Sequence, residues 1–148
     1  MSHPSQISTL EAFHNAYDVF VFTLGSLAES ADKQCELMGD YNTAWELRDD
    51  ALAGHYLIGS GLFTEQQEAG ILEFLAQIDL IPVIEMPFGS GRAVNLAAMQ
   101  NPAWEPIRDL AQQLLALLPP VTAANRAYLG LSDAPNNSFK PTPLRGAA

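Results

Sequence analysis

The chain has 148 residues, of which 48% are hydrophobic, and it carries 17 acidic against 7 basic side chains. This length and composition are typical of one globular domain with its own core, and they exclude a wholly disordered protein. The formal net charge of -10 argues against nucleic acid and anionic membranes as partners, because both are bound through Lys and Arg side chains. It favours a basic protein partner or a metal cation.

Cysteine content and the N-terminal sequence indicate the cellular compartment. The single cysteine, Cys35, excludes an intramolecular disulfide and a cysteine-rich zinc site, and we expect it to be a buried thiol within a helix. The N-terminal stretch MSHPSQIST has neither the basic nor the apolar region of a secretory signal. No apolar run approaches the length needed to cross a bilayer. We therefore expect a cytoplasmic protein.

The first predicted elements are two long helices. Ser8 and Glu11 form a capping-box pattern, and the apolar residues that follow recur at steps of three and four, which predicts one helix ending near Gly39. A second helix is expected over residues 43–58, where a Gly-Ser-Gly stretch stops it. If the chain reverses between them, the two helices form an antiparallel hairpin.

Shorter elements complete the domain. Thr64 and Gln67 form a second capping-box pattern, which predicts a helix through Ile78. Residues 81–87 are bounded by prolines and are expected to form an extended connector. Further helices are expected over residues 92–99, 102–118 and 122–129. The sequence predicts an all-α fold, an irregular bundle of about five to six helices built on a long N-terminal helical hairpin.

A composition change near Leu131 divides the chain into a domain, residues 1–131, and a mobile C-terminal tail, residues 132–148. The apolar period vanishes there, and prolines and asparagines replace it. The ending NSFKPTPLRGAA resembles the endings of small proteins encoded on bacterial integron gene cassettes, where the reading frame runs into the recombination site. The resemblance covers only these residues and implies a mobile bacterial gene; the body matches no family. The alternative is that the tail docks on a partner or a second copy.

Acidic residues on both sides of the predicted hairpin turn are candidate metal ligands. Helical spacing places Glu29 and Asp32 on one face of the first helix, and Glu46 and Asp49 on one face of the second. Carboxylates that face each other across a hairpin suit Mg²⁺. The pattern is similar to the E-x-x-E…E-x-x-D signature of the all-α nucleoside-triphosphate pyrophosphohydrolases, although Asp32 replaces a glutamate. That resemblance implies that these four residues bind Mg²⁺; the alternative is that they form solvated helix faces.

Two further groups of residues are candidate binding sites. Ser90, Gly91 and Arg92 precede a predicted helix, where free amides and an arginine can hold an anion, or else form a flexible loop. The second group, a candidate ligand pocket, consists of Trp45, Tyr56 and Trp104, whose alternative role is to anchor the core or an interface.

The charge, the tail and the lack of a strong catalytic motif favour a non-enzymatic, integron cassette-encoded accessory protein. Such a protein would bind a basic partner as an immunity protein or antitoxin does. No cofactor is expected, and no catalytic residue is predicted. The first alternative is a Mg²⁺-dependent nucleotide pyrophosphohydrolase, and the second is a small-ligand-binding protein. A helical domain with this much apolar surface could also form a homodimer.

Overall fold

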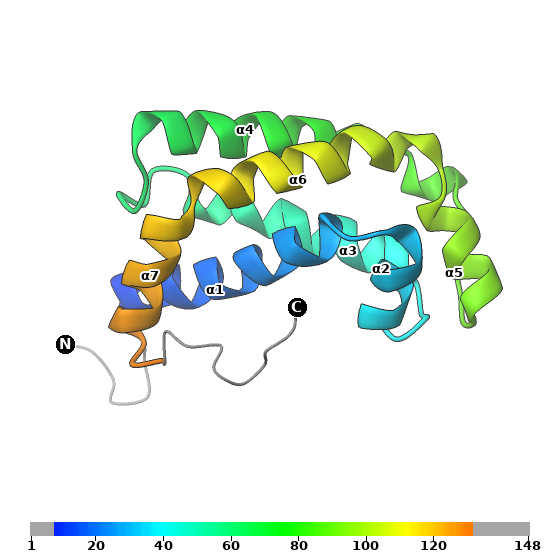
Figure 1. The fold of residues 1–148 in the computed structure, drawn as a ribbon, viewed down its shortest axis with the longest axis horizontal. Coiled ribbons are helices and arrows are strands. Elements are labelled where there is room, and N and C mark those ends of the chain that lie inside the picture. Colours follow the sequence, from blue (N-terminus) through cyan, green and yellow to red (C-terminus); the bar gives the residue numbers. More distant parts are fainter. Residues whose placement is uncertain (1–7, 132–148) are drawn as a thin grey trace.

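A computed structural model of the chain describes residues 8–131, which form seven α-helices and no strands (Figure 1). Four helices surround the core: α1 (Thr9–Leu27), α3 (Thr43–Leu52), α4 (Glu65–Asp79) and α6 (Glu105–Leu117). At one end of this bundle α2 (Ala31–Leu37) packs against α5 (Arg92–Met99), and at the other end α7 (Pro119–Tyr128) packs against α1. Three 3-10 turns join them: η1 (Ala53–Leu57), η2 (Val83–Glu85) and η3 (Pro102–Trp104). The all-α prediction is confirmed.

The core lies between the inner faces of these four helices. Phe20 on α1 meets Phe74 on α4 edge-to-face, with ring centroids 6.0 Å apart, and both rings are buried. Trp104 and Ile107 fill the core from the side of η3 and α6. These apolar side chains recur at three- and four-residue steps in the sequence, so one face of each helix is turned inward.

The expected single helix from Ser8 to Gly39 is wrong, because the chain breaks between α1 and α2. Ser30 caps α2 by accepting a hydrogen bond of 3.2 Å from the main-chain N–H of Lys33. The last carbonyls of α1 accept hydrogen bonds from two glutamine side chains, Leu27 from Gln34 at 3.0 Å and Ala28 from Gln112 at 3.2 Å. Carbonyls at a helix end need such partners, and here α2 and α6 supply them. The long N-terminal hairpin is therefore replaced by a bent arrangement of three helices.

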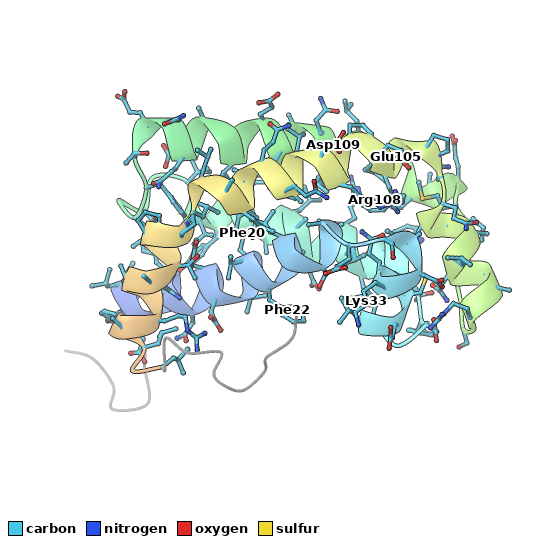
Figure 2. All side chains as sticks on the ribbon, in the orientation of Figure 1. Phe20, Phe22, Lys33, Glu105, Arg108 and Asp109 are labelled. Carbon is cyan, nitrogen blue, oxygen red and sulfur yellow. The ribbon has the colours of Figure 1, made fainter. Side chains whose placement is uncertain are left out.

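Arg108 holds this bend against the rest of the bundle. Its side chain is only 13% exposed and extends from α6 toward α2 and α5 (Figure 2). The guanidinium donates hydrogen bonds to the Met99 carbonyl at 2.6 Å and to Oε1 of Gln34 at 3.0 Å. Burial lowers the pKa of Arg108, and the nearby Glu105 carboxylate opposes that change. One side chain therefore ties the end of α5 and the middle of α2, which follows the bend, to α6.

The remaining expectations are confirmed or shifted by short distances. The capping box of α4 is present, with Thr64 Oγ1 accepting from the Gln67 amide and Gln67 Oε1 accepting from the Thr64 amide. The expected helix over residues 43–58 divides into α3 and η1. The connector at 81–87 contains the turn η2 and is not extended throughout. Pro119 and Pro120 begin α7 because proline suits the first turn of a helix, so the last helix starts three residues earlier than expected.

Two expectations concern the ends of the chain and its relation to membranes. Of the helices that residues 8–131 form, none combines the length and the apolar character needed to cross a bilayer. The tail at residues 132–148, with its integron-like ending, lies outside the described residues.

Candidate functional site

The four expected Mg²⁺ ligands do not come together. Glu29 lies in the bend between α1 and α2, whereas Asp32 lies in the first turn of α2, with its carboxylate 3.2 Å from Arg92. Glu46 and Asp49 lie on α3. Within residues 8–131, no group of three or more His, Cys, Asp or Glu side chains is arranged to hold a metal ion. The expected convergence is wrong because the helix that was to carry Glu29 and Asp32 on one face is broken between them.

Acidic side chains remain concentrated on α3. Partial burial raises the pKa of Asp50, and repulsion from Glu46 and Asp49 raises it further. The one basic residue of this helix, Arg48, points its guanidinium to Asp79 on α4, at 3.4 Å. The α3 acidic face, which we define as Glu46, Asp49 and Asp50, is therefore a region of negative potential that its neighbours do not neutralise.

The expected anion site at Ser90, Gly91 and Arg92 is filled by the chain itself. The Gly91 amide donates to the Asp40 carbonyl at 2.8 Å, and the Arg92 guanidinium binds both carboxylate oxygens of Asp40, at 2.5 and 3.3 Å. Ser90 pairs with Tyr41 in a single antiparallel bridge, and Gly91 takes the cap position of α5. The donors predicted to hold an external anion thus hold the loop that precedes α3.

Asn95 completes this loop-to-loop contact. Its side chain is fully buried, and Nδ2 donates to three main-chain carbonyls, those of Asp40, Gly89 and Gly91, at 2.7–2.9 Å. Oδ1 accepts a hydrogen bond of 2.7 Å from the Thr43 amide. The sequence analysis missed this residue, and the only signal for it is a polar residue among the apolar residues of α5.

The three aromatic residues proposed as a ligand pocket differ in burial and do not line a common cleft. Trp104 is fully buried in the core, so a ligand could reach it only if the bundle opened. Trp45 is half-buried on α3, and Tyr56 is 50% exposed on η1, where its ring contacts Phe13 at a centroid distance of 5.0 Å. None of the three lines the two clefts described below. Trp104 is a core anchor, as the alternative interpretation had it.

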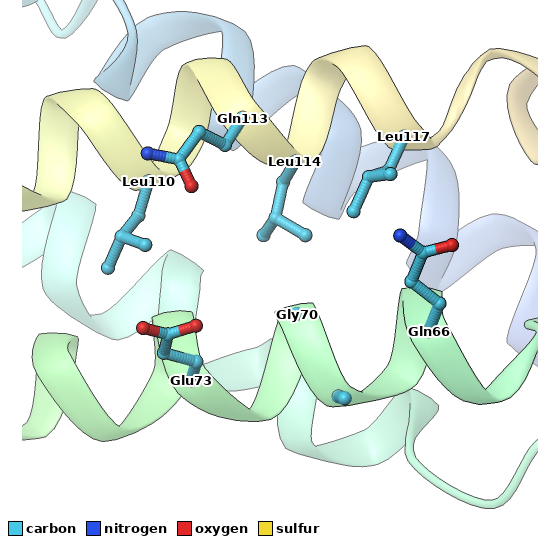
Figure 3. Close-up of a pocket in the computed structure, with 8 residues that line it drawn as sticks. Gln66, Gly70, Glu73, Leu110, Gln113, Leu114 and Leu117 are labelled. Atoms are coloured by element: carbon cyan, nitrogen blue, oxygen red, sulfur yellow. The ribbon is translucent and has the colours of Figure 1, made fainter.

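A shallow groove of about 270 Å³ runs between α4 and α6 (Figure 3). Leu110, Leu114 and Leu117 of α6 form its apolar side, and Gln66 and Glu73 of α4 stand at its ends. Gly70 brings the two helices close together, because a Cβ atom there would lie 3.0 Å from Cδ2 of Leu114. Because Gly70 has no side chain, no atoms from this position fill the groove, although the two helices lie close together there.

A larger cleft, of about 420 Å³, lies at the α7 end of the bundle. It is lined by α1, the turn before α4, the first turn of α4, and α7. His14 of α1 and Gln67 of α4 are its buried polar residues. The His14 side chain is 8% exposed, and its Nδ1 donates a hydrogen bond to Asn125 Oδ1, 2.7 Å away. The imidazole also stacks on Tyr128, with centroids 3.9 Å apart. Contacts from α7 therefore fix the ring at the edge of the cleft.

The structure thus presents an acidic face on α3, a groove between α4 and α6, and a histidine-lined cleft beside α7. Neither Asn95 nor His14 belonged to the residues predicted to form a site. Comparisons of the chain with protein-family models, with curated proteins and with solved structures found no match.

Proposed function

We propose that this protein is a non-enzymatic binding domain whose acidic surface recognises a basic protein partner, as an immunity protein or antitoxin masks a toxin's cationic site. The observation that carries the proposal is the uncompensated charge of the folded body. Residues 8–131 hold 16 acidic and five basic side chains. Four of the five, Lys33, Arg48, Arg92 and Arg108, already form ion pairs within the chain.

Most of the acidic side chains remain available to a partner. The intramolecular ion pairs use five acids, and eleven of the 16 have no ion pair among residues 8–131. The eleven are Glu11, Asp18, Glu29, Glu46, Asp49, Asp50, Glu65, Glu68, Glu73, Glu85 and Asp109. A surface of this kind attracts a basic protein at long range and accelerates their encounter.

The α3 acidic face is the part of this surface that we expect to bind a cationic side chain of the partner most favourably. Partial burial and, after it, repulsion from Glu46 and Asp49 raise the pKa of Asp50, which means that its ionised form is disfavoured in the free protein. A Lys or Arg placed there by a partner would relieve the repulsion and gain Coulomb energy at the same time. The face therefore supports a specific contact in addition to general attraction.

The C-terminal resemblance to integron cassette proteins agrees with this role. It implies a mobile bacterial gene, and toxin–antitoxin components are among the cargo that such cassettes carry. The resemblance rests on residues 137–148 alone, and it identifies no particular partner.

The test is affinity capture of basic proteins by the full chain at low and moderate salt, followed by measured affinities for each protein retained. The α3 variant neutralises the face with three isosteric substitutions, Glu46→Gln, Asp49→Asn and Asp50→Asn. We expect one defined basic protein to bind the wild-type chain with an affinity that falls as salt rises, and to bind the α3 variant at least about tenfold more weakly.

A charge-matched control separates recognition from ion exchange. It neutralises three acids elsewhere on the surface, through Glu65→Gln, Glu73→Gln and Asp109→Asn, and changes the net charge by the same amount. The control should retain most of the affinity. Equal losses in the two variants, or no basic protein retained even at low salt, would refute the proposal.

A further inference from the structure

The cleft beside α7 has the size and lining of a small-molecule site. Its volume of about 420 Å³ falls within the range of ligand pockets, roughly 300–1,000 Å³. Leu62, Phe63 and Val121 contribute apolar walls, while Thr64 and His14 bring polar atoms to its edge. It lies at the left end of the bundle in Figure 1, where α7 meets the start of α1 and of α4.

The hydrogen bond to Asn125 determines which nitrogen of His14 remains free. An amide oxygen accepts and cannot donate, so the 2.7 Å contact places a proton on Nδ1 of the ring. In the neutral imidazole, Nε2 then carries a lone pair and acts as an acceptor. Among residues 8–131 no hydrogen-bond partner is found for Nε2, although the ring is 8% exposed and lines the cleft.

Stacking on Tyr128 and the contact with Asn125 hold the His14 ring at the edge of the cleft. Nε2 is not among the buried side-chain atoms of residues 8–131 that lack a hydrogen-bond partner, so solvent reaches it. A ligand that brings a donor into the cleft would replace water at this acceptor, while the apolar walls bury the rest of the molecule.

We infer that the cleft binds a small apolar molecule carrying one N–H or O–H donor, which donates to Nε2 of His14. The acidic body, with 16 acids against five bases in residues 8–131, disfavours anions and admits neutral or cationic ligands. The simplest molecules that combine an apolar body with one such donor are an aromatic ring with a hydroxymethyl group and an aromatic ring with an aminomethyl group. The site is separate from the α3 acidic face, which lies on a different helix.

The experiment titrates the full chain with benzyl alcohol, benzylamine, toluene and benzoate, and follows the imidazole nitrogens by NMR. In the free protein, the His14 spectrum should show the tautomer protonated at Nδ1. Benzyl alcohol, benzylamine or both should shift the Nε2 resonance saturably, and should bind about tenfold more tightly than toluene, which has no donor. The alcohol and the amine distinguish a neutral from a cationic ligand.

Two variants and their controls locate the binding. Ala124→Trp adds a large ring at a residue that lines the cleft and replaces neither His14 nor Asn125, so it should abolish saturable binding. Ala97→Trp, at an exposed position of α5, should leave binding unchanged. His14→Phe removes the acceptor and should erase the preference for the alcohol or amine over toluene, while His55→Phe on η1 should not.

Three outcomes would overturn the inference. The first is a free-state tautomer protonated at Nε2, and the second is equal affinity for toluene and the two donors. The third is shifts that never saturate or that persist in Ala124→Trp. All of these leave the proposal for the α3 acidic face intact, because that proposal involves none of the cleft residues.

Discussion

Oδ1 of Asn95, on α5, accepts a 2.7 Å hydrogen bond from the main-chain amide of Thr43, the first residue of α3. The two residues are 52 positions apart in the chain. Nδ2 of the same Asn95 side chain donates to three main-chain carbonyls, so this fully buried group joins the loop before α3 to the loop before α5. Asn42 adds a second link between these loops, because its Oδ1 accepts a 2.7 Å hydrogen bond from the Gly89 amide.

Asn95→Asp should destabilise the protein strongly. The new carboxylate would face the carbonyls of Asp40, Gly89 and Gly91, and we expect a loss of about 3–5 kcal/mol in the free energy of unfolding at neutral pH. Part of the loss should return in acid, because a protonated carboxyl can donate again. Urea unfolding at several pH values measures both effects. The same change at the exposed Asn15 is the control, and similar costs at the two positions would contradict the assignment.

Two glycines should respond to alanine in opposite directions. At Gly25, within α1, a Cβ atom meets nothing within 4 Å, so Gly25→Ala should raise the free energy of unfolding by about 0.5–1 kcal/mol through lower chain entropy. At Gly54 the added atom would lie 2.6 Å from the Phe20 ring, and Gly54→Ala should cost about 1–3 kcal/mol. Urea midpoints compare the pair. A neutral Gly54→Ala would mean that Phe20 moves freely in the core.

Asp50→Asn should stabilise the protein at neutral pH. Partial burial and the two neighbouring carboxylates raise the pKa of Asp50 in the folded protein above its ordinary value of 3.8. A raised pKa means that folding becomes less favourable as the pH rises through it, and the amide removes this penalty. Below 3.8 the carboxyl is protonated in both states, so the gain should vanish there.

Thermal unfolding at neutral and acidic pH tests whether Asp50→Asn stabilises the protein at neutral pH only. Asp109→Asn removes the same charge from an exposed position that has no ion pair within residues 8–131, and it should change the melting temperature less. If the two variants gained equally at neutral pH, the effect would come from net charge and not from the α3 acidic face.

Cys35 should be unreactive in the native protein. Its side chain is fully buried, and burial raises the pKa of the thiol, an effect that the nearby Arg92 opposes only in part. We expect a disulfide reagent at mildly alkaline pH to modify it at least about 100-fold more slowly than in denaturant, because reaction requires local opening. Ser90→Cys provides an exposed thiol for comparison. Native Cys35 reacting as fast as that thiol would show that α2 detaches readily.

Short-range sequence signals determined most helices of this protein. The capping box of Thr64 and Gln67 began α4 where predicted, and α5 was expected over the residues it occupies. Such signals work because a cap or an apolar stripe involves residues only three or four positions apart. The burial of Cys35 was also predicted, from a single apolar thiol in a helical stretch.

Tertiary structure decided which polar residues meet, and it acted together with the local Ser30 cap in deciding where α1 ends. At the break before Ser30, Gln112 caps a carbonyl 84 residues away, and the break dispersed the carboxylates that helical spacing had aligned. His14 and Asn125 are 111 residues apart, and no period in the sequence links them. A hydrogen bond between distant residues depends on how whole helices pack, whereas helix propensity and capping act within one or two turns. The sequence thus determined the helices, and their packing determined the sites.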